Sequence, residues 1–376
     1  MRIAQIATLA TPVRQQGSGS IETLVWLLTR ELTRLGHEVT VFATAGSETH
    51  GELVATLPGP YGTDGSPGDW QLCEWINLCR AVECSSRFDV LHSHAYLWGL
   101  PLQRLACAPM VHTMHVGPGE DEALLWSMVP DACVTAISHD QWSTFHELQP
   151  AAIIYHGVDE TQLTFCSQPE DYVCYLGRFT PGKGPLQAIT AARELGLRLL
   201  LAGPADAYYQ EVLEPLVDGR SVEYVGYVTG RDRDRLLGGA RALLYPVQSP
   251  EPFGLVLVEA MTCGTPVAAM GLGAVPEIIE EGVSGYWTTS VEDFPEQVAR
   301  ALGLDRSRVR ERATERFAAE RMARRYAQVY EQLVERGAPG PQTRRHRARS
   351  TRPAAAPREG QGPRRSRSPA GNVGEP

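Results

Sequence analysis

The sequence is almost without lysine. Of its 35 basic residues, 34 are arginine, and Lys183 is the only lysine. Such a bias is typical of a GC-rich genome. A single lysine that persists against this bias makes the residues around Lys183 a candidate site.

Other features are absent as well. No apolar stretch approaches the ~20 residues that a membrane-spanning helix needs. The segment MRIAQIATLA (1–10) has one arginine and no small-residue cleavage site after a long apolar core, so no secretory signal is predicted. The eight cysteines form no Cys-x-x-Cys pair, which argues for reduced thiols rather than a disulfide framework or a zinc site. These absences predict a cytoplasmic protein with no integral membrane segment.

Charge is placed unevenly along the chain. The net charge is −9, but residues 337–376 hold nine Arg and two Glu, or +7, which leaves −16 on the preceding 336 residues. An acidic body argues against nucleic acid or an anionic membrane as the main partner. Residues 337–376 contain no Phe, Trp, Tyr, Ile, Leu or Met, so they are predicted to be a disordered Arg/Pro-rich tail.

Short apolar runs alternate with helical patterns, which is typical of α/β proteins with doubly wound parallel sheets. The rhythm starts once at residue 3 and again near residue 171, so two Rossmann-like domains are expected. The predicted strands are 3–7, 39–42, 89–92, 110–115, 134–137 and 153–155, then 172–176, 197–201, 222–225, 242–245 and 267–269. The predicted parts are an N-terminal domain over 1–167, a C-terminal domain over 168–306, helices over 307–336 and the tail over 337–376.

Ligands in doubly wound sheets bind at the carboxyl ends of strands. The strand 172–176 runs into GRFTPGKG (177–184), where glycines permit close backbone approach, and Arg178 and Lys183 flank the start of a helix. This combination suits a diphosphate. The alternative is a surface loop with solvated charges, and the position of the lone lysine favours the site.

A second candidate is EPFGLVLVE (251–259), which follows the strand 242–245. Glu251 is predicted in the loop, Phe253, Gly254 and Leu255 open a helix, and Glu259 lies about one and a half turns beyond Gly254. Free N–H groups at a helix start can hold phosphate or sugar hydroxyls, and carboxylates accept hydrogen bonds from vicinal hydroxyls. The alternative is an ordinary acidic helix start.

The first domain offers Gly19 and Ser20 at the start of its first helix, where a phosphate could bind. The spacing is not Gly-x-Gly-x-x-Gly, and no acidic residue ends the strand 39–42, so an NAD-type cofactor is disfavoured.

Histidines gather at the ends of two first-domain strands. His115 lies where a strand gives way to VGPG (116–119), so it is expected to face the cleft, whereas His92 and His112 are expected to pack or cap. No carboxylate or cysteine completes an obvious metal-ligand spacing. Asp232-Arg233-Asp234 matches the Asp-x-Asp pattern of some metal-dependent sugar transferases, but it opens a helix, where acidic residues are common. No metal site is predicted.

Taken together, residues 1–335 resemble the retaining glycosyltransferases of the GT-B fold, family 4 (group 1) type. One departure lies at YHGVD (155–159), where that family usually has Asn in place of His156. Another is Ser20, which replaces the second glycine of the family's Gly-Gly-x-Glu turn and narrows the room beside the diphosphate. The motifs that carry the resemblance are GSIE (19–22), DVLHSH (89–94), VHTMH (111–115), GRFTPGKG (177–184) and EPFGLVLVE (251–259), the last followed by AMTCGTPV.

The resemblance implies transfer of a sugar from a nucleotide-sugar donor with retention of anomeric configuration, without metal or other cofactor. It also implies that a C-terminal helix (316–335) crosses back onto the first domain. It assigns the catalytic residues as His115, near the reacting carbon, and Glu251, on the donor sugar. It assigns donor binding to Gly19, Ser20, Arg178 and Lys183 at the diphosphate, Glu259 at the ribose, Tyr227 and Val228 at the base, and the backbone of Phe253, Gly254 and Leu255.

The acceptor is expected to be a small soluble molecule, with His94 and Glu120 as candidate contacts. The acidic run 120–122 favours a cationic acceptor such as an amino sugar or aminocyclitol, in keeping with specialised metabolism. A lipid acceptor is disfavoured because helix 70–83 carries Glu74 and Glu83 against a single Arg80.

Three other classes stay open from sequence: a nucleotide-sugar 2-epimerase, a non-catalytic sugar-nucleotide binding module, and a pyridoxal-phosphate phosphorylase, for which Lys183 is the only lysine available for a Schiff base. Oligomeric state is not predicted.

The tail generates a first prediction. Deletion of residues 337–376 is expected to change neither the melting temperature nor the rate of sugar transfer, because the segment lacks any apolar anchor and its arginines repel one another. Calorimetry and steady-state kinetics of the full and shortened chains would test this. A large loss of activity would show that the tail binds an acidic partner or substrate.

Overall fold

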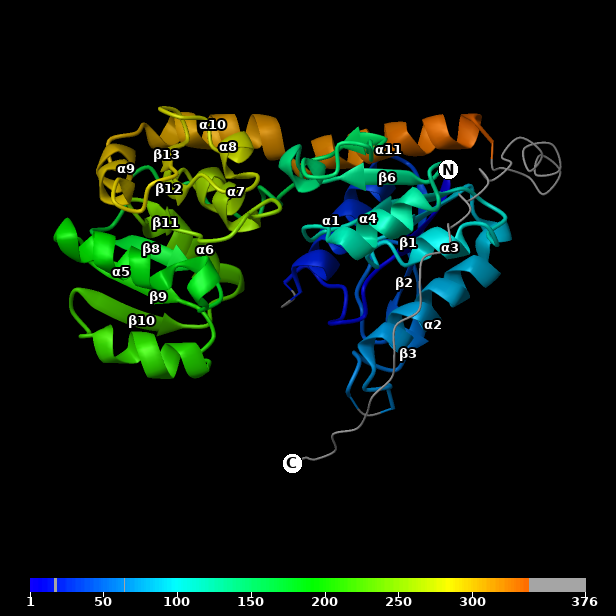
Figure 1. Cartoon of the computed structure of the whole chain (residues 1–376), viewed down its shortest axis with the longest axis horizontal. Coiled ribbons are helices and arrows are strands. Elements are labelled where there is room, and N and C mark those ends of the chain that lie inside the picture. The colour runs from blue at the N-terminus through cyan, green and yellow to red at the C-terminus, as the bar shows by residue number, and fades with distance from the viewer. Residues whose placement is uncertain (17–18, 64, 338–376) are drawn as a thin grey trace, which may run out of the picture. The chain divides into compact units, whose positions relative to one another are not determined.

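Two parallel β-sheets with helices on their faces make up the fold, as a computed structural model of the chain shows (Figure 1). The structure describes residues 1–16, 19–63 and 65–337; the predicted tail lies outside these residues apart from Gly337. In both sheets the first strand lies in the centre, and the chain adds strands first to one side and then to the other. This is the doubly wound order, and it confirms the predicted pair of Rossmann-like sheets.

The first sheet has seven strands in the order β3-β2-β1-β4-β5-β6-β7. Its strands are β1 (Arg2–Ile6), β2 (Glu38–Thr44), β3 (Glu52–Leu57), β4 (Val90–Ser93), β5 (Met110–Thr113), β6 (Cys133–Ala136) and β7 (Ala152–Ile153). Its helices are α1 (Ser20–Arg34), α2 (Trp70–Glu83), α3 (Gly99–Leu102) and α4 (Glu120–Ser127), with short 3₁₀ turns at Ser85–Arg87 and Asp140–Trp142.

The second sheet has six strands in the order β10-β9-β8-β11-β12-β13. Its strands are β8 (Val173–Leu176), β9 (Leu199–Ala202), β10 (Val222–Gly226), β11 (Leu243–Tyr245), β12 (Val267–Met270) and β13 (Gly285–Thr288). Its helices are α5 (Pro185–Glu194), α6 (Gly230–Gly239), α7 (Leu255–Thr262), α8 (Val275–Ile278) and α9 (Phe294–Ala301).

Sequence periodicity missed two strands, β3 and β13. Each has one neighbouring strand only, and most of its residues are partly exposed. They therefore lack the continuous apolar run by which the central strands were recognised. Helix α7 also begins later than predicted, at Leu255, so Phe253 precedes it.

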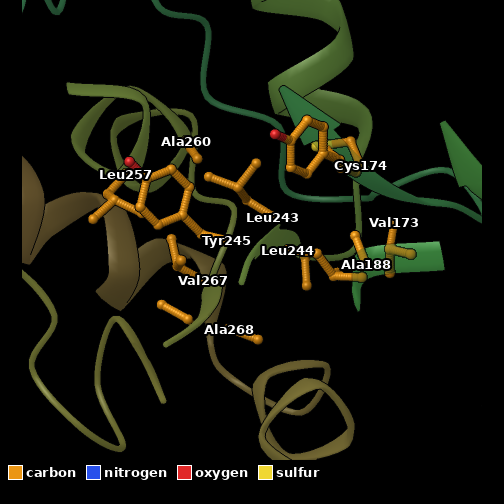
Figure 2. Packing of buried hydrophobic residues seen from close by; sticks show 14 of the residues in the cluster. Val173, Cys174, Ala188, Leu243, Leu244, Tyr245, Leu257, Ala260, Val267 and Ala268 are labelled. Carbon is orange, nitrogen blue, oxygen red and sulfur yellow. The ribbon is translucent and has the colours of Figure 1, made fainter. Parts of the chain in front are cut away.

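The core of the second sheet fixes helix α7 against the strands that carry the site. Figure 2 shows Leu257 and Ala260 of α7 beside Leu243 and Tyr245 of β11. Leu243, Leu257 and Ala260 are fully buried, and burial of each leucine contributes about 2 kcal/mol. The position of α7 relative to the end of β11 is therefore set by packing rather than by the loop between them.

Two final helices, α10 (Arg306–Phe317) and α11 (Ala319–Glu335), complete the described chain. Met322, Tyr326 and Tyr330 form an apolar stripe on α11 and lie in the same buried cluster as the first-sheet residues, including Leu28 of α1. The hydroxyl of Tyr330 accepts a hydrogen bond from Gln5 Nε2 at 3.1 Å. Helix α11 therefore covers the first sheet.

The chain passes between the two sheets twice, and the two passages lie side by side. The amide of Val158 donates to the carbonyl of Phe317 at 3.0 Å, and Val158 and Ala318 form a parallel bridge. A Cβ on Gly157 would lie 2.7 Å from Cα of Ala319, so only glycine allows this approach. We call the paired segments 155–158 and 317–319 the hinge ribbon.

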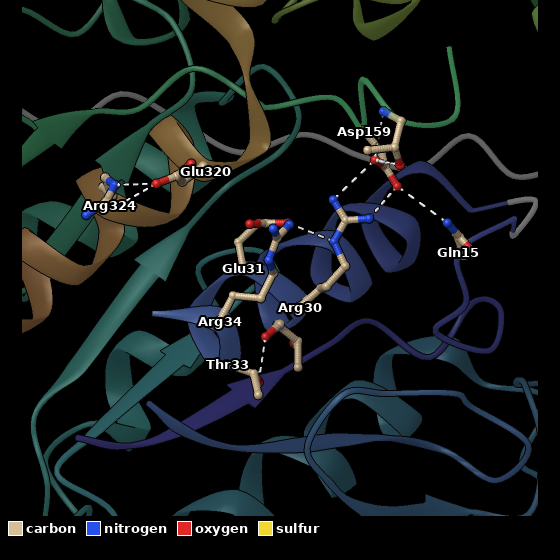
Figure 3. Close-up of polar contacts among 10 residues, drawn as sticks. Gln15, Arg30, Glu31, Thr33, Arg34, Asp159, Glu320 and Arg324 are labelled. Atoms are coloured by element: carbon tan, nitrogen blue, oxygen red, sulfur yellow. Dashed lines mark hydrogen bonds and ion pairs between the residues drawn. The ribbon is translucent and has the colours of Figure 1, made fainter. Parts of the chain in front are cut away.

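An ion pair ties helix α1 to the residue that follows this ribbon. Arg30 donates to both carboxylate oxygens of Asp159, at 2.5 and 3.2 Å, and Gln15 adds a hydrogen bond at 3.4 Å (Figure 3). Burial opposes ionisation of Asp159, but the hydrogen bonds from Arg30 and Thr161, together with the Arg30 charge, outweigh it and lower the pKa of the carboxyl.

All eight cysteines are free thiols. Across 1–16, 19–63 and 65–337, no helix combines the length and the apolar character required to cross a bilayer.

One buried carboxyl group holds the loop that follows β1. Glu74 of α2 is 1% exposed and accepts a hydrogen bond from the amide of Leu9 at 2.8 Å, while its second oxygen has no partner. Burial raises the pKa of Glu74 to about 7, and nearby Glu22 adds to the effect. The protonated form of this side chain is thus favoured in the folded chain.

This generates a second prediction. The Glu74 carboxyl ionises near pH 4.5 when unfolded and near pH 7 when folded, so the folded chain loses stability as pH rises from about 4.5 to 7 and stays less stable above that. Glu74→Gln removes this loss. Its gain in unfolding free energy relative to the wild type is expected to be up to about 3 kcal/mol larger at pH 8 than at pH 4.5. Urea denaturation at both pH values measures the difference.

The exposed Glu83 of the same helix supplies the matched control, Glu83→Gln. A gain from Glu74→Gln that is equal at both pH values would contradict the raised pKa.

Candidate functional site

A cavity of about 630 Å³ lies at the carboxyl ends of the central strands β8 and β11, where the strand order of the second sheet reverses. This is the position at which doubly wound sheets bind ligands. Eight residues of the predicted donor site line it: Gly19, Ser20, Arg178, Lys183, Tyr227, Val228, Leu255 and Glu259.

The loop after β8 is held by buried aromatic side chains. The hydroxyl of Tyr175 donates to the carbonyl oxygens of Arg178 and Lys183, at 2.9 and 3.3 Å. Phe179, fully buried, stacks between Tyr175 and Tyr209, with ring centroids 5.9 and 5.5 Å away. Burial raises the pKa of Tyr175, so its hydroxyl stays a donor. The apolar Phe179 inside this basic loop therefore acts as its anchor.

The loops after β8 and β11 touch through their backbones. Gly184 has φ +70°, and a Cβ there would lie 1.8 Å from the carbonyl oxygen of Pro246. The amide of Gln248 donates to the carbonyl of Gly182 at 2.8 Å. Only glycine at 184 permits both the conformation and the contact. The contact brings Lys183 next to the residues that follow β11.

Lys183 meets Glu251 and Tyr245 at one carboxylate oxygen. Lys183 Nζ and the Tyr245 hydroxyl each lie 2.5 Å from Glu251 Oε2. Burial, and then the Glu251 charge, raise the pKa of Tyr245 well above its ordinary value. Tyr245 therefore donates to the ionised carboxylate. Glu251 does not line the cavity itself; its two partners do.

The backbone of Glu251 is fixed by the loop after β12. The amide of Ala274 donates to the carbonyl of Glu251 at 2.8 Å, and Gly273, with φ +68°, approaches Glu251 so closely that a Cβ would lie 2.3 Å from its nitrogen. A carboxylate with a fixed backbone and two short hydrogen bonds is preorganised.

Helix α7 presents its N-terminal end to the cavity. Gly254 precedes it with φ +85°, and the first two residues of the helix, Leu255 and Val256, line the cavity. Phe253 turns the other way: it is 2% exposed and packs edge-on against His156 at 4.8 Å. The side chain of Phe253 thus anchors the helix start rather than facing a ligand.

Glu259 of α7 is hydrogen-bonded to Arg233 of α6, and both line the cavity. Burial raises the pKa of Glu259, while the charge of Arg233 opposes the rise. Of the two aspartates beside Arg233, Asp234 accepts from the amide of Thr164 at 2.7 Å, and Asp232 is exposed. Throughout the described ranges, no three His, Cys, Asp or Glu side chains converge as a metal site would need.

The histidines of the first sheet form a continuous hydrogen-bonded chain with Gln5 and Tyr330. His115 Nδ1 lies 3.4 Å from His156 Nε2, and His115 Nε2 lies 2.9 Å from His94 Nδ1. His94 Nε2 lies 2.8 Å from Gln5 Oε1. Beyond the Gln5–Tyr330 bond, the Tyr330 hydroxyl lies 2.7 Å from His92 Nδ1.

The chain assigns one tautomer to each of His94, His115 and His156. Because Gln5 Oε1 can only accept, His94 carries its proton on Nε2 and accepts at Nδ1 from the Nε2–H of His115. His115 then accepts at Nδ1 from the Nε2–H of His156, whose own Nδ1 has no partner. Burial lowers the pKa of His115 to about 3 and those of His94, His156 and His92 well below the ordinary value, so the rings are neutral.

These contacts bear on the predicted catalytic and acceptor residues. Both ring nitrogens of His115 are engaged, so a substrate can bond its ring only by displacing a neighbour, and the 3.4 Å contact with His156 is the longer of the two. His94 is 1% exposed and has no free ring nitrogen. Glu120 is exposed at the start of α4. Neither His115, His94 nor Glu120 lines the 630 Å³ cavity.

Three residues of the site were not found from sequence. Tyr245 is the last residue of β11 and lies inside the predicted strand 242–245 rather than after it. Arg233 was read only as the spacer of an Asp-x-Asp pattern. His156 was noted as a departure, but its place between His115 and Phe253 depends on tertiary packing, for which the sequence gives no signal.

Solved structures with the same fold define the class of protein. AviGT4, a glycosyltransferase involved in avilamycin A biosynthesis, is 25% identical with a TM-score of 0.69, over 89% of this chain and 98% of that chain. Sucrose-phosphate synthase from Thermosynechococcus elongatus is 20% identical, with a TM-score of 0.75 over 89% and 100%. Anabaena HepE, solved with UDP and glucose, is 19% identical, with a TM-score of 0.67 over 88% and 100%. The fold is GT-B, as predicted.

Two family models cover most of the chain between them. Residues 21–162 match Glycosyltransferase Family 4, and residues 165–316 match Glycosyl transferases group 1. The chain belongs to the family 4, group 1 glycosyltransferases. D-inositol 3-phosphate glycosyltransferase of Mycolicibacterium gilvum is 28% identical over 80% of this chain and 81% of its own length. That of Mycolicibacterium smegmatis is 29% identical over 76% and 79%.

The histidine chain generates a third prediction. With ¹⁵N-labelled histidine, the nitrogen shifts of His94, His115 and His156 are expected to show the neutral Nε2–H tautomer from pH 5 to pH 8, because burial keeps all three pKa values low. The same sample unfolded in urea provides the titrating reference. Protonation of any of these rings near pH 6 would contradict the assignment.

Proposed function

We propose that the protein transfers a sugar from a nucleoside-diphosphate sugar to a small acceptor, with retention at the anomeric carbon. The observation that supports this most is the placement of the only lysine. Lys183 is held by the contact between the β8 and β11 loops, its Nζ lies on Glu251, and both Lys183 and Arg178 line the cavity. This suits a site in which negative charge on a diphosphate increases during reaction.

Lys183 and Arg178 would bind the diphosphate together with the first amides of α7. Glu251 pairs with Lys183 in the structure. A bound diphosphate would compete for the ammonium group, and the Glu251 carboxylate could then accept hydrogen bonds from hydroxyls of the donor sugar. Tyr245 would keep the carboxylate in place throughout.

In the part of the cavity away from the diphosphate, Glu259 and Arg233 would hold the ribose. Tyr227 and Val228 would lie beside the base. Tyr227 is 60% exposed, so its ring is available to a flat ligand. HepE, which shares the fold, has been solved with UDP and with UDP-glucose, in keeping with a nucleotide sugar in a site of this kind.

In the proposed reaction the bond from the anomeric carbon to the diphosphate oxygen breaks, and a bond to an acceptor hydroxyl oxygen forms. The hydroxyl proton leaves with the diphosphate. Lys183 and Arg178 neutralise the leaving group, so no metal or other cofactor is proposed. His115, fixed in its tautomer by His94 and His156, would lie near the sugar, which makes His94 a positioning residue rather than an acceptor contact.

The acceptor is proposed to be a small soluble molecule with several hydroxyl groups. The named activity of the mycobacterial relatives, on an inositol phosphate, supports a cyclitol-sized acceptor. The exposed Glu120 and Asp121, with the half-buried Glu122 beside them at the start of α4, favour a cationic one. The eight free thiols are in keeping with a cytoplasmic place of action.

A fourth prediction tests the role of Lys183. Lys183→Ala is expected to lower kcat by about 10²–10³-fold, or about 3–4 kcal/mol of barrier, because the leaving diphosphate loses its preorganised cation. The donor is found first by a thermal-shift screen of UDP, GDP, ADP and TDP sugars, in which ligand at 100 times its Kd adds about 2.7 kcal/mol. Product formation is then followed by mass spectrometry.

The exposed Arg193→Ala is the matched control, since it removes a cation outside the cavity. Near-normal turnover of Lys183→Ala would overturn the phosphate role. Donor binding without transfer or donor hydrolysis would identify a binding module, and an epimerised donor would identify an epimerase.

A further inference from the structure

A second cavity, of about 420 Å³, lies on the hinge ribbon and is separate from the donor cavity. Three arginines line it, Arg316 at the end of α10 and Arg321 and Arg325 on α11. His139 and apolar side chains, among them Ile153, complete the wall. No Asp or Glu lines this cavity, although the body of the chain has an excess of acidic residues.

The three guanidinium groups are not in direct contact with any carboxylate of the described residues, since none of the three forms an ion pair within 4.0 Å. Arg316 donates to the carbonyls of Glu277 and Ile278, and Arg325 to that of Ile153, which satisfies N–H groups without balancing charge.

The nearby carboxylate of Glu277 is already occupied. It accepts hydrogen bonds from the amides of His139 and Asp140, at 2.8 and 2.7 Å, and from the hydroxyl of Tyr155 at 3.0 Å. Arg321 and Arg325 are spaced i,i+4 on α11, where like charges destabilise a helix. An arrangement that costs stability on its own is expected to be offset by an anion.

We propose that this cavity binds a phosphorylated small molecule. Arginine guanidinium groups match the geometry of phosphate oxygens and are less strongly hydrated than the lysine ammonium, so a cluster of them suits a phosphate group. The apolar part of the wall, formed by Ile153, Ile154, Phe317 and Met322, would cover a carbon skeleton. A cavity of this size suits a molecule such as a sugar phosphate.

The site would act on the hinge ribbon, because the ribbon separates it from the donor cavity. Tyr155, Phe317 and Ala318 line the second cavity, whereas Gly157 and Val158 line the donor cavity. An occupant that pairs with Arg316 and Arg321 would bind residues on both sides of the Phe317–Ala319 passage. It would thereby stabilise the bond from Val158 N to Phe317 O. Any resulting effect on a donor rests on the proposed function, whereas phosphate binding does not.

Calorimetry with inorganic phosphate and with pyrophosphate, at constant ionic strength, tests the proposal on the full chain. The double variant Arg321→Ala/Arg325→Ala is expected to weaken binding at least tenfold. Arg324→Ala is the matched control, since this exposed arginine of the same helix pairs with Glu320 and does not line the cavity. Lys183→Ala separates the two sites, because it weakens only binding at the donor cavity.

Retention of wild-type affinity in the double variant would overturn the proposal, as would loss of all phosphate binding in Lys183→Ala. Hydrogen exchange provides the second readout. Pyrophosphate is expected to slow exchange of the Val158 amide severalfold in the wild type and in Arg324→Ala, but not in the double variant. Exchange that is unchanged in the wild type would overturn the action on the hinge ribbon. Both measurements stand even if no sugar is transferred.

Discussion

The site depends on one backbone contact, between Gly184 after β8 and the carbonyl of Pro246 after β11. The two strands are neighbours at the point where the strand order reverses, so their loops diverge unless something joins them. With no side chain at 184, the loops meet, and a lysine from one reaches a glutamate from the other. The side chains of Phe179 and Tyr175 fix the loop after β8, and the close approach of Gly273 fixes the loop after β11. A cation and a carboxylate are thereby fixed before any ligand arrives.

The two halves of the molecule use the same sheet order for different purposes. In the second half, polar side chains at the strand ends face a cavity. In the first half, the histidines near the strand ends hydrogen-bond mostly to one another and to Tyr330. Tyr330 lies on α11, and its hydroxyl takes part in the same chain of hydrogen bonds. Helix α11 therefore does more than cover an apolar face, because it supplies a hydroxyl to a buried polar network that would otherwise lack a partner.

Sequence reasoning found the fold and the two loops of the second half, because both depend on local rules. Parallel strands read as apolar runs, and ligand groups follow them directly, as at 177–184 and 251–259. It missed what depends on packing between distant segments. Nothing local shows that Phe253 turns inward against His156, that Arg233 bonds Glu259 in the cavity wall, or that His94 is enclosed. The edge strands β3 and β13 were missed for a local reason. Most of their residues are partly exposed, so their sequences lack a clear apolar run.

The scarcity of lysine has a practical consequence. Nζ of Lys183 is the one aliphatic amine among the side chains of the sequence, and the side chain of Lys183 is 26% exposed within its contact with Glu251. An amine-selective reagent therefore has one side-chain target, and that target lies in the cavity. A compound that binds in the cavity would protect this single amine from the reagent. The extent of labelling at Lys183 therefore measures occupancy of the cavity, and the measurement requires no knowledge of the acceptor.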